Sequence, residues 1–353
     1  MKIRRYILCL AILLFGLLSP GNILADMEIR QKVIELLQSS SLSKQLYAPV
    51  RISPEKSGVI SIADEGNFLM QYMVIEPNIS ADANLVIDPN IKIPSSCNKA
   101  VIITHGWIDK ASSDWPADIA KEMRKKVDPN EWICVFFDWR GGAAVVNPID
   151  AAKYARDIAG PRLAKAILEL GKFEHIHLIG HSAGCWAIDN AAKIIAKEMK
   201  PEIHLTFLDA YVPPGWTESD LGNIKDQKSR WVDHYYTKDI TLSSTHKNLT
   251  EAHNVDITNI DPGIKEHEFP YRWYYATVAG KYRDSDAEAG DKVLTRYKGL
   301  DYGFDRSLEA GQTNWEKSLT LQKGNEAVKL KKAEKKKFFD FNIFKSKEKQ
   351  KNE

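Results

Sequence analysis

The sequence predicts an α/β fold in which a mostly parallel central sheet is covered by helices on both faces. After residue 94, short apolar runs alternate with longer helical segments, which is the pattern of a parallel sheet with helical crossovers. The apolar runs are continuous, as expected for strands that are buried on both faces. The chain has 353 residues and an apolar content of 44%, which is enough to fill the core of one large domain.

The predicted elements follow one another along the chain. Strands are expected at 101–104, 133–137, 175–179, 203–208 and 231–236. Helices are expected at 116–126, at 148–170 with an interruption near Gly160-Pro161, and at 183–199, since proline is favoured at the start of a helix and disrupts its interior. Residues 271–279 are expected to form the last core helix or strand. Upstream, residues 58–61 and 68–75 are β-rich and flank a turn signal at 64–67.

The N-terminal 25 residues have the features of a cleaved signal peptide. Lys2, Arg4 and Arg5 precede an apolar run at 6–18, and Ala25 offers a cleavage site. The run is shorter than the roughly 20 residues that span a bilayer. We therefore expect export, either to the periplasm or out of the cell. The remaining chain divides into an N-terminal extension (26–66), a core domain (67–282), a C-terminal extension (283–322) and a Lys-rich disordered tail (323–353).

The net charge of +2 is unevenly distributed. Residues 1–25 contribute +3 and residues 323–353, with eleven Lys and five acids, contribute +6, so that residues 26–322 carry 2 − 3 − 6 = −7. A main part of the chain with net negative charge offers no positively charged surface for nucleic acid. The basic tail contains an aromatic stretch at 338–344 and suits contact with an anionic membrane surface. A merely solvated tail is the alternative.

Three cysteines remain after removal of the signal segment: Cys97, Cys134 and Cys185. Three thiols cannot build a disulfide framework, so free buried thiols are favoured. If one bridge forms, Cys97 and Cys134 are the expected pair.

The motif Gly180-His181-Ser182-Ala183-Gly184 fits the G-x-S-x-G pattern and lies between a predicted strand and a predicted helix. A sharp strand-to-helix turn needs small residues on both sides of the serine and leaves its hydroxyl exposed at the carboxyl end of the sheet. The start of the helix directs N–H groups toward developing negative charge. In this setting the motif indicates an α/β-hydrolase nucleophile at Ser182.

His105-Gly106-Trp107 ends the first buried strand of the core. A His-Gly pair at this point is typical of the loop that supplies one donor of an oxyanion hole. The expected donors are the backbone N–H groups of Trp107 and Ala183.

A serine needs an adjacent base, and the base needs a carboxylate that orients it. In this fold the acid and the histidine follow the serine in the chain. Asp209 directly follows the apolar strand at 203–208 and is therefore the favoured acid. Asp233 and Asp261 are its rivals.

The favoured base is His267, which precedes the aromatic final element of the core. His234 lies inside a predicted strand, where a packed residue is expected. His246 and His253 lie in a polar loop.

Several segments together resemble the pancreatic-lipase family. The similar segments lie at 104–109, 137–142, 178–184, 207–210, 231–233, 253–256 and 267–275, and they span roughly residues 67–280. The resemblance implies an α/β-hydrolase fold and carboxylic-ester hydrolysis, with acylglycerols or phospholipids as substrates. It also implies Ser182, Asp209 and His267 as the triad.

The sequence departs from that family at two places. The vertebrate members carry a cysteine-bounded lid before the histidine, whereas residues 256–267 are short, polar and free of cysteine. The segment after residue 283 is too short for the family's second domain. The family's calcium ligands do not map onto this sequence, so no metal or other cofactor is assigned.

The expected function is that of an exported serine hydrolase, a lipase or esterase acting on lipids or small acyl esters. The same fold also hosts peptidases, thioesterases and acyltransferases, since fold alone does not determine chemistry. A non-catalytic binding protein is disfavoured because serine, acid and histidine are all present in the expected order.

Overall fold

The computed structural model describes residues 48–68, 71–72, 84–107, 114–225, 230–238, 245, 247–260, 266–283, 303–304 and 318–320. Within these residues one sheet has the strand order β10-β9-β8-β7-β6-β4-β5-β2-β1-β3. Its strands are β1 (Val50–Pro54), β2 (Ile60–Asp64), β3 (Leu85–Ile87), β4 (Lys99–Thr104), β5 (Trp132–Asp138), β6 (His175–His181), β7 (Glu202–Leu208), β8 (Arg230–Tyr236), β9 (His253–Asp256) and β10 (Ser318–Thr320). The expected signal peptide and the Lys-rich tail lie outside the described residues.

Most neighbouring strands of the sheet are parallel, and β1 pairs with β2 in the antiparallel direction. Strand β4 lies between β5 and β6, so the chain moves outward in one direction after β4 and in the other direction after β5. Such a reversal is a topological switch point, and open α/β sheets bind their ligands there, beyond the carboxyl ends of the strands.

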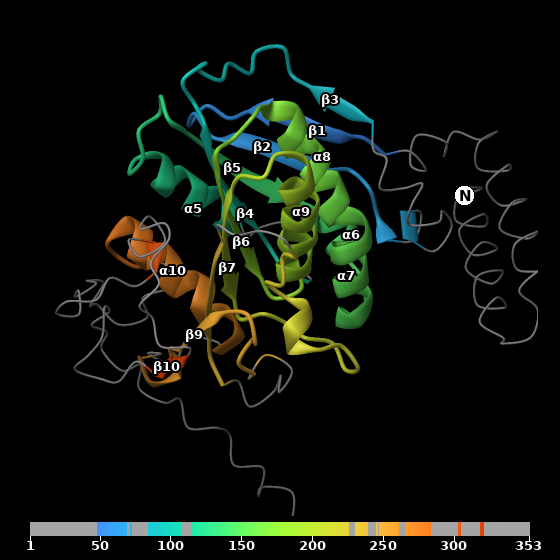
Figure 1. The fold of residues 1–353 in the computed structure, drawn as a ribbon, viewed down its shortest axis with the longest axis vertical. Coiled ribbons are helices and arrows are strands. Elements are labelled where there is room, and N and C mark those ends of the chain that lie inside the picture. The colour runs from blue at the N-terminus through green and yellow to red at the C-terminus, as the bar shows by residue number, and fades with distance from the viewer. Residues whose placement is uncertain are drawn as a thin grey trace, which may run out of the picture.

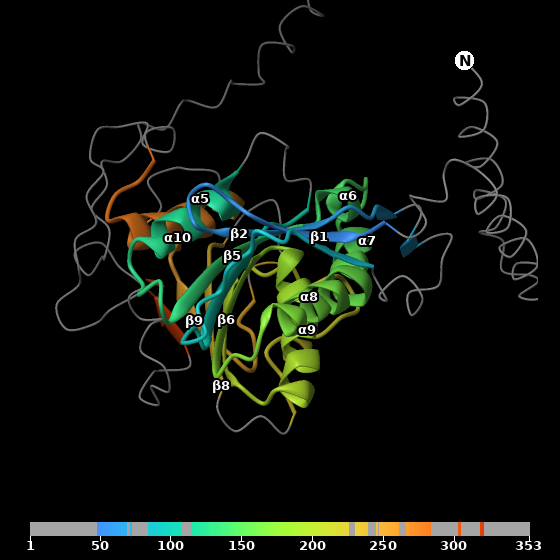
Figure 2. The ribbon, with the colours of Figure 1, turned by 90° about the horizontal axis from the view of Figure 1, so that it is seen from above.

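Helices cover both faces of the sheet, as the sequence predicts, and the α/β fold is confirmed (Figure 1). Helices α5 (Trp115–Arg124) and α10 (Phe269–Ala279) lie on one face. The other face carries α6 (Arg140–Ala143), α7 (Pro148–Tyr154), the π-helical segment η2 (Ala155–Ala159), α8 (Gly160–Leu170) and α9 (Gly184–Glu198). The view from above in Figure 2 shows the two helical layers on opposite sides of the sheet.

The two layers receive alternate side chains of the same strands. In β4, Ile102 packs with the α8 and α9 layer, whereas Val101 and Ile103 pack with α5 and α10. All three side chains are at most 1% exposed. Because successive side chains of a strand point to opposite faces, a strand covered on both faces must be apolar throughout. This explains the continuous apolar runs.

Three expectations need correction. Strands β1 and β2 precede residue 67, the expected start of the core domain, yet β2 pairs with β5 in the central sheet. The sheet also includes β10, which lies in the expected C-terminal extension. In the expected strand at 68–75, the described residues Phe68, Gln71 and Tyr72 are helical. Phe68 and Tyr72 stack with ring centroids 5.2 Å apart, as the four-residue spacing of a helix allows.

The remaining elements agree closely with the expectations. Residues 271–279 belong to a helix, α10, and the expected interruption near Gly160-Pro161 appears as the π-helical segment η2, which ends at Ala159. His253 begins β9, although the sequence placed it in a polar loop. Cys97, Cys134 and Cys185 are free and buried, which confirms the favoured alternative for the thiols.

Candidate active site

Ser182 occupies the sharp turn between β6 and α9. Its φ angle is 53°, in the left-handed region that residues with a side chain rarely adopt. The backbone N–H of Ser182 donates to the carbonyl oxygen of Leu208 at 3.0 Å, which ties the turn to the end of β7. A strained serine held by its surroundings is the arrangement expected of a nucleophile elbow.

The glycines on both sides of Ser182 are required by close backbone approach. A Cβ atom on Gly184 would lie 2.1 Å from the carbonyl oxygen of His105, and one on Gly180 would lie 2.9 Å from that of Gly184. Larger residues would therefore push α9 away from β4 and β6. The turn packs this tightly only because both positions lack a side chain.

Three segments that are far apart in the sequence bring Ser182, His267 and Asp209 together. Asp209 follows β7 with a φ of 49°, and His267 lies in the short 3-10 helix η6 (Glu266–Glu268) before α10. The Nε2 atom of His267 lies 3.0 Å from Ser182 Oγ, and its Nδ1 atom lies 2.6 Å from Asp209 Oδ2. The three favoured residues thus form one continuous hydrogen-bonded chain.

The partners of His267 determine its tautomer. A carboxylate oxygen only accepts, so Nδ1–H donates to Asp209 and Nε2 is left to accept the hydroxyl proton of Ser182. The other carboxylate oxygen of Asp209 accepts from the N–H of Thr237 at 2.9 Å. Burial raises the pKa of Asp209, while the hydrogen bonds from His267 and Thr237 oppose that rise.

The two expected oxyanion donors flank Ser182. A Cβ on Gly106 would lie 2.8 Å from Ser182 Cβ, so the loop after β4 contacts the serine directly. The Nδ1–H of His105 donates to the carbonyl oxygen of Gly106 at 2.9 Å. Because the peptide between Gly106 and Trp107 is trans, the N–H of Trp107 points away from the direction of that carbonyl. Ala183 is the N-cap of α9. Among the described residues, neither N–H has a backbone acceptor.

His105 fixes this loop to the end of β5. Its Nε2 atom accepts from the N–H of Trp139 at 3.0 Å, and its ring stacks on the Trp139 ring with centroids 5.2 Å apart. Burial opposes ionisation of Asp138, but the neighbouring His105 and Arg140 lower the pKa of this carboxyl below its usual range. The segments at 104–107 and 137–142 therefore support each other.

The described rivals of Asp209 and His267 lie elsewhere. Asp233 is buried near His204 and Tyr235. His234 is a packed residue, since its Nε2 accepts from the N–H of Ala210, and His253 stacks on Trp231. The two other rivals, Asp261 and His246, lie outside the described residues.

Comparison with known proteins agrees with this geometry. A family model described as Lipase matches residues 90–250. Pancreatic lipase-related protein 2 of Sus scrofa is 35% identical over 212 residues, which are 51% of this chain and 44% of that protein. Both matches support a pancreatic-lipase-like family of the α/β-hydrolase superfamily for this chain.

Two pancreatic triacylglycerol lipases are also similar to this lipase-like chain. The protein of Mus musculus is 31% identical over 33% of this chain and 24% of its own length, and that of Sus scrofa is 26% identical over 47% and 34%. The chain thus spans less than half the length of these curated relatives.

Sequence reasoning missed one residue of this lipase-like site, His181. Its Nε2–H donates to the backbone carbonyl oxygen of His267 at 2.9 Å. Its ring packs edge-on against Trp115 and Tyr271 and lies 4.7 Å from the His267 ring. Burial and the neighbouring His267 hold the pKa of His181 well below its usual value, so it stays neutral. Its position beside Ser182 in the motif was the only available signal.

The described residues contain no cluster of three or more His, Cys, Asp or Glu side chains arranged to hold a metal ion. None of their helices has the length and hydrophobicity needed to cross a bilayer.

Proposed function

We propose that this protein is an exported serine carboxylic-ester hydrolase that cleaves acylglycerols or phospholipids. The observation that carries the proposal is the hydrogen-bonded chain from Ser182 through His267 to Asp209, held by three separate loops at the carboxyl edge of the sheet. The lipase names of the relatives support esters of lipids as the substrate class.

In the proposed reaction, His267 accepts the proton of Ser182 as the serine oxygen attacks the ester carbonyl carbon. Asp209 holds His267 in the required tautomer and stabilises the imidazolium that forms. The N–H groups of Trp107 and Ala183 stabilise the negative oxygen of the tetrahedral intermediate. The proton on His267 then passes to the departing alcohol.

The second half of the reaction releases the acid. Water takes the place of the alcohol, and His267 removes a proton from it as it attacks the acyl-enzyme. Collapse of the second intermediate breaks the bond to the Ser182 oxygen, which regains its proton from His267. Ester and water are thus converted to acid and alcohol.

The test is hydrolysis of p-nitrophenyl esters by the full chain. We expect Ser182→Ala to lower kcat by at least a thousandfold, because no other hydroxyl of the described residues hydrogen-bonds to the His267 ring. The circular dichroism spectrum should stay that of the wild type. Retention of activity in this variant would refute the proposal. His253→Ala serves as the matched histidine control, since His253 packs on Trp231, and it should stay active where His267→Ala does not.

The substrate is identified by an acyl series on the wild-type protein, from acetyl to palmitoyl esters, with a phospholipid in parallel. A peptide substrate and a thioester substrate test the alternative chemistries. A higher kcat/KM on either of these than on every ester would contradict ester hydrolysis as the main activity.

A further inference from the structure

A hollow lies along the outer face of α9. It has a volume of about 760 Å³ and runs between the C-terminal half of this helix and the segment that joins β7 to β8. The residues that define this α9 groove are Lys193, Lys197 and Lys200 on one side and Ser219, Asp220 and Lys225 on the other. Ser182 precedes α9 by two residues, so at 1.5 Å per residue Lys197 lies roughly 20 Å further along the helix axis. The groove is therefore separate from the candidate active site.

The wall of the groove is held firmly in place. Lys193 bonds to Asp189 at 2.5 Å and donates to the backbone carbonyl oxygen of Asp220 at 2.7 Å. Asp189 also accepts from the N–H of Gly222 at 2.8 Å. The capping box between Thr217 and Asp220 fixes the short helix η3 (Glu218–Asp220). The hydrogen bonds from Lys193 to Asp220 and from Gly222 to Asp189 thus join the two sides of the groove.

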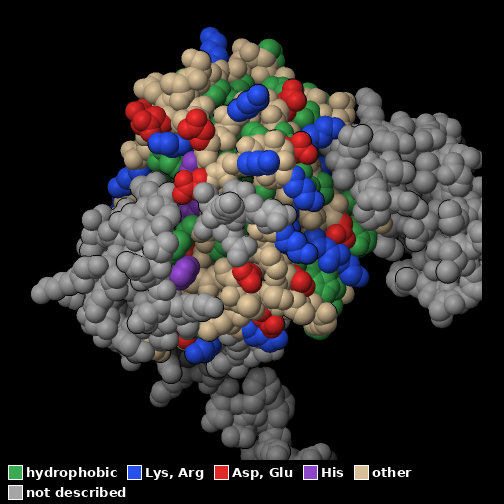
Figure 3. All heavy atoms as spheres, in the orientation of Figure 1, with side chains coloured by type: hydrophobic (Ala, Val, Ile, Leu, Met, Phe, Trp, Pro, Cys, Tyr) green, Lys and Arg blue, Asp and Glu red, His purple; other side chains and the backbone are tan. Residues whose placement is uncertain are grey.

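The other three lysines provide charge that the groove does not neutralise. Lys197, Lys200 and Lys225 are exposed, and none of them has an ion pair within the described part of the chain. The one carboxylate in the lining is that of Asp220, which already accepts from the N–H of Thr217. Figure 3 shows lysine and arginine side chains on the face formed by α8 and α9, with acidic side chains among them.

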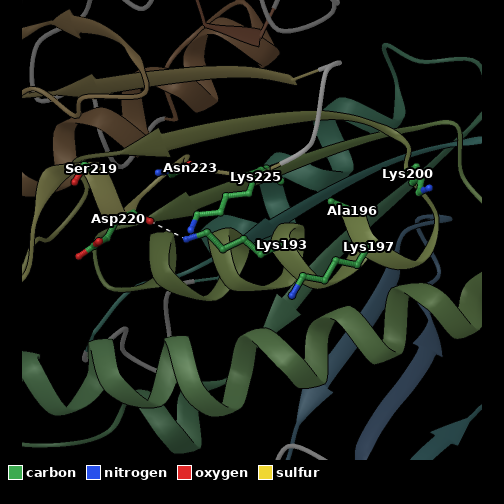
Figure 4. Close-up of a pocket in the computed structure, with 9 residues that line it drawn as sticks. Lys193, Ala196, Lys197, Lys200, Ser219, Asp220, Asn223 and Lys225 are labelled. Carbon is green, nitrogen blue, oxygen red and sulfur yellow. Dashed lines mark hydrogen bonds between the residues drawn. The ribbon is translucent and has the colours of Figure 1, made fainter.

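The placement of the lysines suits an extended anion. Lys193 and Lys197 lie one turn apart on α9, and Lys200 follows the end of this helix. Lys225 reaches from the opposite wall to the end of Lys193, beside Asp220 (Figure 4). Lys200 has a φ of 53°, the left-handed conformation in which helices commonly end.

We propose that the α9 groove binds a phosphate-bearing ligand with at least two anionic groups. Lysine is a common partner of phosphate, and several lysines that line one groove can contact separate anionic groups. The ligand is either a soluble phosphate compound or the headgroups of an anionic phospholipid. Both present the same chemistry to the groove. The proposal does not depend on ester hydrolysis.

The test compares two triple variants of the full chain. The groove variant replaces Lys197, Lys200 and Lys225 by Gln. Lys193 is left in place because it holds the wall. The control variant replaces Lys56, Lys126 and Lys172 by Gln, three exposed lysines outside the groove, so that both variants lose the same charge. Pyrophosphate binding is measured by titration calorimetry, and sedimentation measures binding to vesicles of phosphatidylglycerol and phosphatidylcholine.

We expect saturable pyrophosphate binding that weakens at least tenfold in the groove variant and less than twofold in the control. A matching loss of vesicle binding confined to the groove variant identifies phospholipid headgroups as a ligand. Unchanged vesicle binding identifies a soluble phosphate compound. Absence of saturable pyrophosphate binding, or equal weakening in both variants, would overturn the proposal. Ester hydrolysis in the groove variant should equal that of the wild type, which separates this test from that of the active site.

Discussion

At the scale of single residues, the surroundings of His267 determine what the imidazole can do. Asp209 accepts a hydrogen bond from one ring nitrogen of His267, and the hydroxyl of Ser182 faces the other. His181 donates a hydrogen bond of 2.9 Å to the backbone carbonyl oxygen of His267. His181 lies 4.7 Å from a ring that becomes positively charged in the proposed reaction. A second charge there would oppose that step, so a neutral His181 suits its position.

We predict that His181→Phe lowers kcat about fivefold and leaves KM unchanged. Phenylalanine keeps the packing on Trp115 and Tyr271 but cannot donate to the carbonyl oxygen of His267, and one hydrogen bond contributes about 1 kcal/mol. The measurement is steady-state hydrolysis of a p-nitrophenyl ester.

His181→Gln provides the rescue, because its amide donates where phenylalanine cannot. If both variants lose the same activity, or if KM changes instead of kcat, His181 acts through packing alone.

At the scale of elements, the site depends on how closely α9 approaches the sheet. The start of this helix touches the carbonyl oxygen of His105 at the position of Gly184, and the loop at 105–107 touches Ser182. The hydrogen bond and the ring stacking between His105 and Trp139 hold that loop against β5. The expected oxyanion donors therefore depend on contacts among β4, β5, β6 and α9, none of which is local in sequence.

We predict that Gly184→Ala abolishes most ester hydrolysis even in the fraction of protein that folds. The added Cβ would lie 2.1 Å from a backbone oxygen, so the loop at 105–107 must move away from Ser182. Activity and the midpoint of thermal unfolding are measured on the soluble protein.

Ala192→Gly, in the middle of the same helix, is the matched control. It should cost about 1–2 kcal/mol of unfolding free energy and leave kcat intact. If Gly184→Ala and Ala192→Gly lose the same stability and also the same activity, Gly184 matters for folding only.

At the scale of the whole molecule, buried histidines make stability dependent on pH. Burial lowers the pKa of His177 and His181 well below the usual value, and that of His234 to about 4. At pH values between the pKa of such a histidine in the folded protein and its pKa in the unfolded chain, the folded protein binds fewer protons. Stability therefore rises with pH across that range. Asp189, whose pKa burial raises to about 6, and Asp209, whose pKa burial also raises, oppose this trend.

We predict that the free energy of unfolding falls as the pH is lowered from 7 to 5. His234 alone should contribute about 2 kcal/mol of this fall, since its unfolded pKa is near 6.5. Urea denaturation at both pH values measures it.

His234→Gln is the comparison, because glutamine keeps an acceptor for the N–H of Ala210 without titrating. The variant should lose less stability than the wild type between the two pH values. An unchanged difference would mean that His234 does not stay neutral in the folded protein.

Local sequence patterns predicted much of the sheet, the helices around it and the placing of Ser182 at a strand-to-helix turn. Continuous apolar runs and a glycine-flanked serine are signals carried by neighbouring residues, and packing did not override them. Asp209 and His267 could be ranked above their rivals because the carboxyl ends of parallel strands share one edge, but the sequence contains no distances. The inclusion of β1 and β2 in the sheet, the helical backbone at Phe68 and Tyr72, and the contacts of His105 and His181 arose only in the folded chain. Each depends on partners dozens of residues away, and such contacts leave no periodic or compositional trace in a single sequence.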